Sequence, residues 1–435
     1  MNFRNLAFLF AVVSLAAQEE IGLPSWRYYP HEEYGAMPQN WHFTQDHKGL
    51  MYAANSMGVL IYDGVRWETI KVPSRLVRSV AADDTGRVWV GAYGDLGYLH
   101  TDAVGNTRYV SLMEFVPDSQ KKFSDVWSVV PTAHGVYFST RQSLFVWNGR
   151  AMKIFPGDYG WVSLIDHTVY AAKNKTGLMK ADGDSLVLIP GTESDADNIL
   201  SIFPWLGKLF FFDGKLGLLS FDGQKVTVFS PALTEIFNRE WANRVAVLPG
   251  GEIAVSTHRK GIAVIDSTGR ITRWLNTSTG FVTDDVKNLF VDREGGLWAA
   301  LENGIARIAL SSPSSYFNEG MGLKGTVESM CRWRGRLLIG TGSGAFTMRH
   351  NRGIQFEKIP DIDGQCFDFL NAGDAVIAAT GDGIFEINER VRKLAGYRSA
   401  VIKRSTANPN IALLGLKEGG VDYAMDDNNK ALVTD

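Results

Sequence analysis

Residues 292–305 read DREGGLWAALENGI, which is a turn with glycine, a short run of β-forming residues with an aromatic, small residues, and then glycine followed by an apolar residue. Residues 83–91, DDTGRVWVG, repeat the first part of this pattern. Weaker copies occur along the rest of the chain, and ten can be aligned on the second glycine or its replacement. These anchor positions are Gly58, Gly94, Ser143, Gly177, Gly217, Gly261, Gly304, Gly344, Gly383 and Gly419.

The spacing of the anchors identifies the kind of repeat. Successive anchors are 36, 49, 34, 40, 44, 43, 40, 39 and 36 residues apart. A period of about 40 residues is the length of one blade of a β-propeller. Helical repeats would show a periodicity of about 3.6 residues, and no long stretch of this chain carries such a stripe. The sequence therefore predicts an all-β fold of the β-propeller type.

Each repeat unit also divides into four short strands. In the first unit the strands are expected at Trp41–Asp46, Leu50–Asn55, Val59–Tyr62 and Arg66–Ile70, from the innermost to the outermost. Between the last two, Asp63-Gly64 is a pair that readily takes the positive φ angles of a tight hairpin turn. Apolar residues alternate at a period of two in the clearer units, as expected for strands between neighbouring sheets. Each unit is therefore predicted to form one four-stranded blade.

Ten blades are too many for one ring, because propellers usually close with about four to eight blades. Residues 311–315, SSPSS, lack strand character and contain a proline that cannot donate a ladder hydrogen bond. Seven repeats precede this break and three follow it. We therefore predict a complete seven-bladed propeller over residues 18–310, a linker over 311–325, and about three blades of an incomplete second propeller over 326–435. The chain is expected to be the N-terminal part of a longer protein or of a prematurely ended reading frame.

The first 17 residues have the three parts of an export signal. Arg4 supplies the positive charge, Leu6–Val13 the apolar segment, and Ser14–Ala17 the small residues of a cleavage site. The apolar run is too short to span a bilayer comfortably. We expect residues 1–17 to be a signal peptide and the mature protein to be periplasmic or extracellular. Membrane attachment is expected only through a C-terminal part that this chain lacks.

Charge and cysteine content narrow the functions further. With 44 basic and 47 acidic residues the formal charge is −3, so no nucleic-acid-binding surface is expected. The two cysteines, Cys331 and Cys366, lie in the second part of the chain. They could pair in an oxidising compartment, but two cysteines in so large a chain are more often simply buried. Whether they pair is left open.

No group of residues identifies a catalytic or metal site. His42 and His47 are five residues apart on a predicted strand, which places them on opposite faces. Residues 182–184, DGD, and 361–364, DIDG, are similar to fragments of calcium loops but lack the further ligands and the closing Glu. We therefore expect no catalytic residues, no bound metal and no cofactor in this chain.

Propeller geometry still predicts where a ligand binds. The loops from the second to the third strand, and those that lead into each innermost strand, gather on one face around the channel. Concave mouths with converging polar groups are the default binding sites of proteins. The candidate ligand-binding residues at this channel mouth are Tyr93, Trp127, Arg141, Trp241, His258, Arg259 and Glu302. Such a mixture of aromatic, cationic and polar groups suits a sugar or an acidic oligosaccharide.

The repeat pattern resembles a known family. Residues 45–55 (QDHKGLMYAAN), 83–99 and 292–308, with the opening YGAMPQNW at 34–41, are similar to the repeats of the two-component regulator propeller family, the sensor ectodomains of bacterial signalling receptors. The resemblance implies two propellers, a small β-sandwich, a membrane helix and a cytoplasmic output domain. It also implies recognition of glycan fragments and no fixed catalytic residues. This chain departs from that plan because it ends within its second propeller.

Three functions are compatible with these observations. The first is a non-enzymatic, ligand-sensing module of a bacterial signal-transduction receptor, which binds a small molecule or a carbohydrate. The second is a scaffold that holds another protein on the propeller rim. The third, a hydrolase or lyase, requires a histidine with an acid or a metal at the channel mouth. The ligand and the oligomeric state, including a homodimer, are left open.

Overall fold

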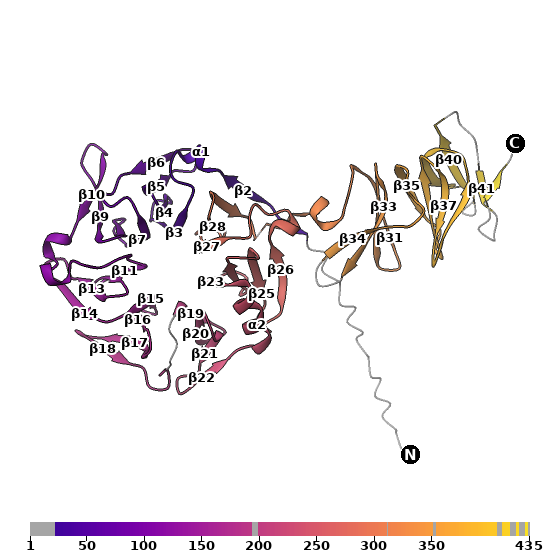
Figure 1. Ribbon diagram of the computed structural model, residues 1–435. Coiled ribbons are helices and arrows are strands. Elements are labelled where there is room, and N and C mark those ends of the chain that lie inside the picture. The colour runs from indigo at the N-terminus through magenta and orange to yellow at the C-terminus, as the bar shows by residue number, and fades with distance from the viewer. Residues whose placement is uncertain are drawn as a thin grey trace, which may run out of the picture.

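The computed structural model describes residues 22–193, 199–310, 312–350, 354–406, 411–417, 423–425 and 431–433. The expected signal peptide at 1–17 and the anchor Gly419 lie outside these residues. The described chain is built almost entirely from antiparallel four-stranded sheets, so the prediction of an all-β fold is confirmed. The sheets form two groups, a ring and a second stack beside it (Figure 1).

Seven sheets make up the first group. The first six follow the chain order, with the strands β3 (Asn40–Gln45), β4 (Met51–Asn55), β5 (Gly58–Tyr62) and β6 (Trp67–Ile70); β7 (Val77–Ala82), β8 (Val88–Ala92), β9 (Asp95–Thr101) and β10 (Thr107–Ser111); β11 (Ser128–Thr132), β12 (Gly135–Ser139), β13 (Ser143–Trp147) and β14 (Met152–Pro156); β15 (Tyr159–Ile165), β16 (Thr168–Lys173), β17 (Gly177–Asp182) and β18 (Ser185–Leu188); β19 (Ile199–Trp205), β20 (Lys208–Asp213), β21 (Gly217–Phe221) and β22 (Val226–Val228); and β23 (Ala242–Val247), β24 (Ile253–Thr257), β25 (Ile262–Ile265) and β26 (Ile271–Leu275). The four strands expected in the first unit are thus confirmed to within one residue at each end.

The seventh sheet joins the two ends of the ring. It contains β27 (Val286–Val291), β28 (Leu297–Leu301) and β29 (Ile305–Ile308), and its outer strand is β2 (Trp26–Tyr29) from the N-terminal end. The first strands of successive sheets contact one another from β3 to β27, and β27 contacts β3 again. Figure 1 shows these first strands around the centre of the ring. The arrangement is that of a β-propeller.

Aromatic packing reinforces the junction between the last sheet and the first. Tyr29, on β2, is 3% exposed and stacks on Trp298 of the same sheet, with 5.8 Å between ring centroids. Its ring also meets Tyr62 and Trp67 of the first sheet, at 5.4 and 5.5 Å. The N-terminal strand therefore closes the ring both by its ladder hydrogen bonds and by a buried aromatic cluster.

The second group contains two further four-stranded sheets. Their strands are β31 (Val327–Trp333), β32 (Arg336–Thr341), β33 (Gly344–His350) and β34 (Ile354–Lys358), then β35 (Cys366–Asn371), β36 (Val376–Thr380), β37 (Gly383–Ile387) and β38 (Val391–Ala395). The pairs β39 (Ser399–Arg404) with β40 (Ala412–Leu416), and β41 (Tyr423–Met425) with β42 (Ala431–Val433), follow. Cys331 and Cys366 are both free, and burial raises the pKa of the Cys366 thiol to about 12.

Two features differ from the expectation. Residues 311–325 were expected to be a linker without strands, but Ser315–Tyr316 forms β30, which pairs with β1 (Leu23–Pro24). The helix α2 (Pro231–Glu240), between β22 and β23, was not expected either. Ser230 caps this helix by accepting a hydrogen bond from the Leu233 N–H, and Pro231 occupies its first turn. The other helix is the single turn α1 (His31–Tyr34).

The anchor positions have a common structural role. All nine anchors within the described residues lie at the start of the third strand of their sheet or directly before it. Gly58 has φ +149° and Gly261 has φ +78°, where residues with a side chain are strained. At both positions a Cβ would also overlap a carbonyl oxygen of the neighbouring fourth strand, that of Ile70 or Leu275. At these two anchors glycine is required because the outer hairpin leaves no space for a side chain.

The aspartate of the repeat ties its turn to the aromatic residue six positions later. Asp83 accepts hydrogen bonds from the Arg87 N–H at 3.0 Å and from the Trp89 indole at 2.9 Å. Asp292 accepts in the same way from Trp298 at 2.8 Å and also from Arg307 at 2.8 Å. Although burial acts in the opposite direction, the hydrogen bonds from Arg307 and Trp298 lower the pKa of Asp292. The repeat phrase thus encodes a buried carboxylate that holds a strand to its preceding turn.

We predict that Asp292→Ala destabilises the ring by about 3 kcal/mol, because it leaves the buried Trp298 indole and the Arg307 guanidinium without their acceptor. Asp266→Ala is the matched control, since Asp266 makes the same turn contacts with Thr268 and Arg270 but binds no aromatic side chain. It should cost about 1 kcal/mol or less. Urea unfolding followed by tryptophan fluorescence measures both values. Equal losses for the two variants would contradict this role of Asp292.

Candidate functional site

A cavity of about 230 Å³ lies where the first strands of the seven sheets converge. Every sheet of the ring contributes to its lining. The lining residues are Trp41, Arg78, Trp127, Arg141, Gly160, Trp161, Ile199, Leu200, Asn243, Arg244, His258, Lys287 and Asn288. They lie near the beginnings of the first strands and in the adjoining loops, which is the face on which the sequence predicts the ligand site.

Irregular strand pairing brings these side chains to the cavity. In the first sheet, Asn40 pairs with Asn55 and His42 pairs with Ala54, so Trp41 has no partner in the ladder. The same shift of register in five other sheets leaves unpaired residues at the corresponding position. The residues in these bulges include Trp41, Arg78, Trp161, Leu200, Arg244 and Lys287, and all six line the cavity. A bulge re-aims a side chain, and here the ring repeats this effect around its channel.

Two guanidinium groups lie against tryptophan rings in the cavity. The Arg78 guanidinium is 4.0 Å from the centroid of the Trp41 ring and 5.6 Å from that of Trp127. On another part of the lining, the Arg244 guanidinium is 4.5 Å from the Trp161 ring. These distances are those of cation–π contacts. The contacts hold both arginines in place while their edges remain available for hydrogen bonds.

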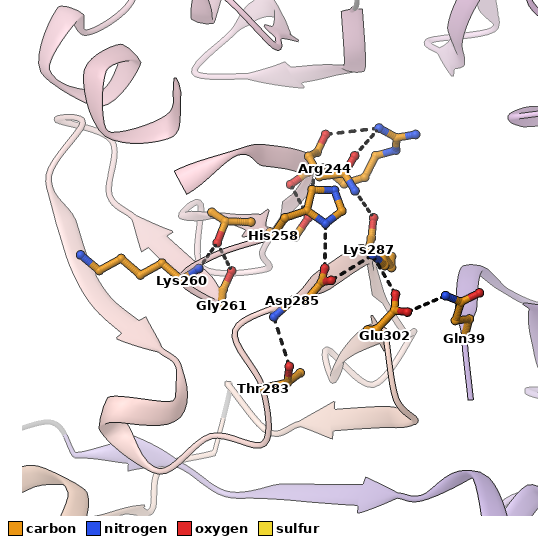
Figure 2. A network of polar contacts seen from close by, with 12 residues as sticks. Gln39, Arg244, His258, Lys260, Gly261, Thr283, Asp285, Lys287 and Glu302 are labelled. Carbon is orange, nitrogen blue, oxygen red and sulfur yellow. Dashed lines mark hydrogen bonds and ion pairs between the residues drawn. The ribbon is translucent and has the colours of Figure 1, made fainter. Parts of the chain in front are cut away.

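A chain of polar contacts borders the cavity and links three sheets (Figure 2). Asp285 accepts from the His258 Nδ1 at 2.7 Å and from the Lys287 Nζ at 3.0 Å. Lys287 also pairs with Glu302 at 2.9 Å, and Glu302 accepts from Gln39 at 2.5 Å. Partial burial alone would lower the pKa of Lys287, but its bonds with Glu302 and Asp285 raise it. Lys287 therefore remains charged at neutral pH.

Burial lowers the pKa of two further groups in the channel. Burial and the nearby charge of Arg141 lower the pKa of the Arg244 guanidinium to about 10, which leaves it charged at neutral pH. His42 lies beside Trp161, with 5.7 Å between ring centroids, and its Nδ1 is 3.0 Å from the Val80 carbonyl oxygen. Burial, and next the charge of Arg244, lower the pKa of His42 to about 4. His42 is therefore neutral above that pH.

The structure separates the residues proposed from the sequence into two sets. Trp127, Arg141 and His258 line the cavity, and Glu302 holds Lys287 at its edge. The other three lie outside this lining. Trp241 is 57% exposed and stacks with Arg259 at 4.0 Å, and Tyr93 is 51% exposed. The site proposed here is the cavity, with the exposed set on the surrounding rim.

Several lining residues were not identified from the sequence, namely Trp41, Arg78, Trp161, Arg244 and Lys287. Trp41 was placed in an expected strand, where alternation predicts burial between sheets or a place in the ladder, and the other four were not assigned to any element. The available signal was the recurrence of a large aromatic or cationic residue near the start of successive first strands. This recurrence does not identify a site unless the bulges are known. In an unbroken ladder the same side chains would lie on other faces of the sheet.

Two other cavities are larger. One, of about 640 Å³, is lined by turn residues and outer strands of the fourth and fifth sheets, including Val187, Leu188 and Pro190. The other, of about 520 Å³, contains Asp292 and Arg307, which already bind each other. Within the described residues, no cluster of three or more histidine, cysteine or acidic residues could hold a metal. No helix in the same part of the chain has the length and apolarity of a membrane span.

Comparison with known proteins gives similarity in fold. No family model and no curated protein sequence matches the chain. The extracellular domain of BT3049 from B. thetaiotaomicron, described as a hybrid two-component system, aligns with a TM-score of 0.68 and 15% identity over 95% of this chain and 60% of that domain. For the extracellular domain of BT4673, from the same organism and described in the same way, the values are 0.52, 14%, 92% and 58%.

A lyase has a similar fold over part of the chain. Virginiamycin B lyase from Staphylococcus aureus, an inactive variant with quinupristin, aligns with a TM-score of 0.51 and 11% identity over 66% of this chain and 99% of the enzyme. At these identities all three likenesses establish the fold alone. This chain spans about 60% of the length of the two receptor domains.

The protonation of His42 predicts a pH dependence of stability. The pKa is about 4 in the folded protein and about 6.5 in the unfolded chain. The unfolded state therefore takes up a proton first as the pH falls, and stability is lost between pH 6.5 and pH 4. The expected loss between pH 7.5 and pH 5 is about 2 kcal/mol.

The variant His42→Phe retains an aromatic ring against Trp161 but cannot titrate, so it should remove about this part of the pH dependence. His100→Phe, at an exposed position of β9, serves as the control and should leave the dependence unchanged. Urea unfolding of the three proteins at both pH values measures the effect. An unchanged pH dependence in His42→Phe would show that another group is responsible.

Proposed function

We propose that this chain is a periplasmic or extracellular ligand-sensing module of a bacterial signal-transduction receptor and that it acts by binding, without catalysis. The module consists of an exported seven-bladed propeller followed by part of a second one. The resemblance of the repeats to sensor propellers supports this function. The similarity in fold to two extracellular domains described as parts of hybrid two-component systems supports it as well.

The observation that carries the proposal is the cavity formed by all seven sheets of the ring. Its lining combines three tryptophans with cationic and amide side chains, which is the composition of a site that binds a small polar molecule. A carbohydrate fits this chemistry, since the apolar face of a sugar packs on an indole ring while its hydroxyl groups find donors and acceptors. A ligand that contacts several sheets stabilises the relative arrangement of those sheets to which it binds most tightly. Such a shift is the signal that a full-length receptor would pass on.

A second candidate function is acid–base catalysis, which one observation favours. The Nδ1 of His258 lies 2.7 Å from Asp285, and this contact leaves Nε2 as the free nitrogen of the ring at the edge of the cavity. A histidine oriented by a carboxylate is a common general base. If the chain is a lyase or hydrolase, incubation with acidic oligosaccharides should yield shorter products by chromatography, and His258→Asn should stop this turnover. We expect no turnover, because Asp285 is shared with Lys287.

The proposed binding function predicts that Trp161→Ala weakens binding by about tenfold or more, since an aromatic plane of the cavity is lost. The probe is a panel of neutral and acidic mono- and disaccharides, titrated into the full chain by calorimetry. Phe115→Ala removes an exposed aromatic ring outside the cavity and should leave affinity unchanged. If every panel member that binds the wild type binds Trp161→Ala equally well, the binding site lies elsewhere and the proposal is contradicted.

A further inference from the structure

The lining of the cavity carries charges of only one sign. Four of its residues, Arg78, Arg141, Arg244 and Lys287, are cationic, and none of the described lining residues is acidic. The chain as a whole has a formal charge of −3, so this concentration of positive charge is local. A low-dielectric cleft lined by one sign of charge attracts ligands of the opposite sign.

Arg244 differs from the other three cations. Arg78 pairs with Asp125 at 2.5 Å, Arg141 with Asp158 at 3.6 Å, and Lys287 with two carboxylates. Arg244 donates only to the backbone and side-chain oxygen atoms of Asn243, at 3.3 and 2.9 Å. Within the described residues no carboxylate neutralises its charge. Arg244 is partly buried, and a charge held away from water without a counter-ion is costly, which makes this position unusual for a purely structural residue.

Two buried nitrogen atoms in the cavity lack an acceptor. The Nε of Arg244 and the Nη1 of Arg78 are shielded from solvent and have no hydrogen-bond partner in the described residues. Native proteins satisfy the large majority of such donors, so each exception calls for an explanation. The lowered pKa of Arg244, caused by burial and then by the charge of Arg141, is a second sign of missing negative charge. An anion in the cavity would supply the missing negative charge and relieve the repulsion between Arg244 and Arg141.

The tryptophans and the volume restrict the shape of that anion. Trp161 and Trp41 cover one face of the two guanidinium groups, so the groups can bind an acid only along their edges. The volume of about 230 Å³ is below the roughly 300–1,000 Å³ of sites for drug-sized ligands. The cavity therefore suits one ring rather than an extended chain. The remaining indole surface supplies a plane for the apolar face of such a ring.

We infer that the ligand of this cavity is an acidic sugar unit, whose carboxylate or sulfate binds the guanidinium group of Arg244 while its ring packs on tryptophan. This inference rests on the proposed function and names the chemical class of the ligand. A guanidinium bound to a carboxylate or sulfate forms short, charge-assisted hydrogen bonds. The acidic group thus supplies the larger part of the selectivity, and the sugar ring contributes through its fit to the cavity.

The test compares sugars that differ only in the acidic group. Glucuronic acid and glucose, galacturonic acid and galactose, and a sulfated glucose are titrated into the full chain by calorimetry, with sodium acetate and sodium sulfate as free anions. The acidic member of a pair should bind at least about tenfold more tightly than the neutral one, because hydrogen bonds to charged groups are the stronger ones. This preference should fall as salt is added. Preference for the carboxylate or the sulfate sugar identifies which acidic group is bound.

Arg244→Gln should abolish the preference for acidic sugars. Its thermal unfolding midpoint without ligand should be equal to or above that of the wild type, since an unpaired buried charge has been removed, and this establishes that the variant is folded. Arg108→Gln removes an exposed cation on β10 and is the matched control, which should keep the preference.

The outcomes separate the inference from the function on which it rests. If neutral and acidic sugars bind equally and both depend on Trp161, the cavity is a binding site and the inference is wrong. If acidic sugars bind but Arg244→Gln retains the preference, the inference is also wrong. Binding of free acetate or sulfate as tight as that of the sugars would show an anion site without sugar recognition. If the affinity of every sugar is indifferent to Trp161→Ala, the proposed function itself fails.

Discussion

The closure of the ring by β2 is the constraint on which the rest of the structure depends. A four-stranded sheet buries both faces only if it has a neighbour on each side, and the first and last sheets of a linear array would each leave one face exposed. Pairing of β2 with β29 completes the last sheet with residues from the other end of the chain. Tyr29 then packs against aromatic side chains of both sheets. Only in a closed ring do all seven first strands face a common channel.

Within the closed ring, two kinds of local feature have different roles. One holds each sheet together, and the other shapes the cavity. The glycine anchors and the turn aspartates act toward the outside of each sheet, where they hold hairpins and aromatic side chains in place. The bulges act at the start of the first strands, where they release one or two residues from the ladder. The chain can therefore vary the side chains in the bulges without disturbing the pairing of the blade. This separation explains how one regular architecture holds a cavity of such particular chemistry.

The cavity also contains groups whose removal from water opposes folding. Arg244 is charged and partly buried and has no acidic partner among the residues that the structure describes, and His42 is kept neutral by burial and the same charge. Neither feature helps the ring to fold, since both remove groups from water without full compensation. Binding sites are often maintained at such a cost, because groups that are already aligned and desolvated bind a complementary ligand more strongly. The pair of His258 and Asp285 lies at the edge of this region, where Lys287 competes for the same carboxylate.

The sequence by itself determined the all-β fold, because each repeat carries its own local requirements. The recurring glycines, the hairpin at Asp63-Gly64 and the alternation of apolar residues are short-range features that can be read directly from the chain. The helix α2 had local signals as well, in Ser230 and Pro231, but it is a single short element among strands. The tertiary structure decided which residues form the cavity. Trp41, Arg78 and Arg244 are far apart in the chain and meet only because the ring closes and their strands bulge, and neither event leaves a mark within a single repeat.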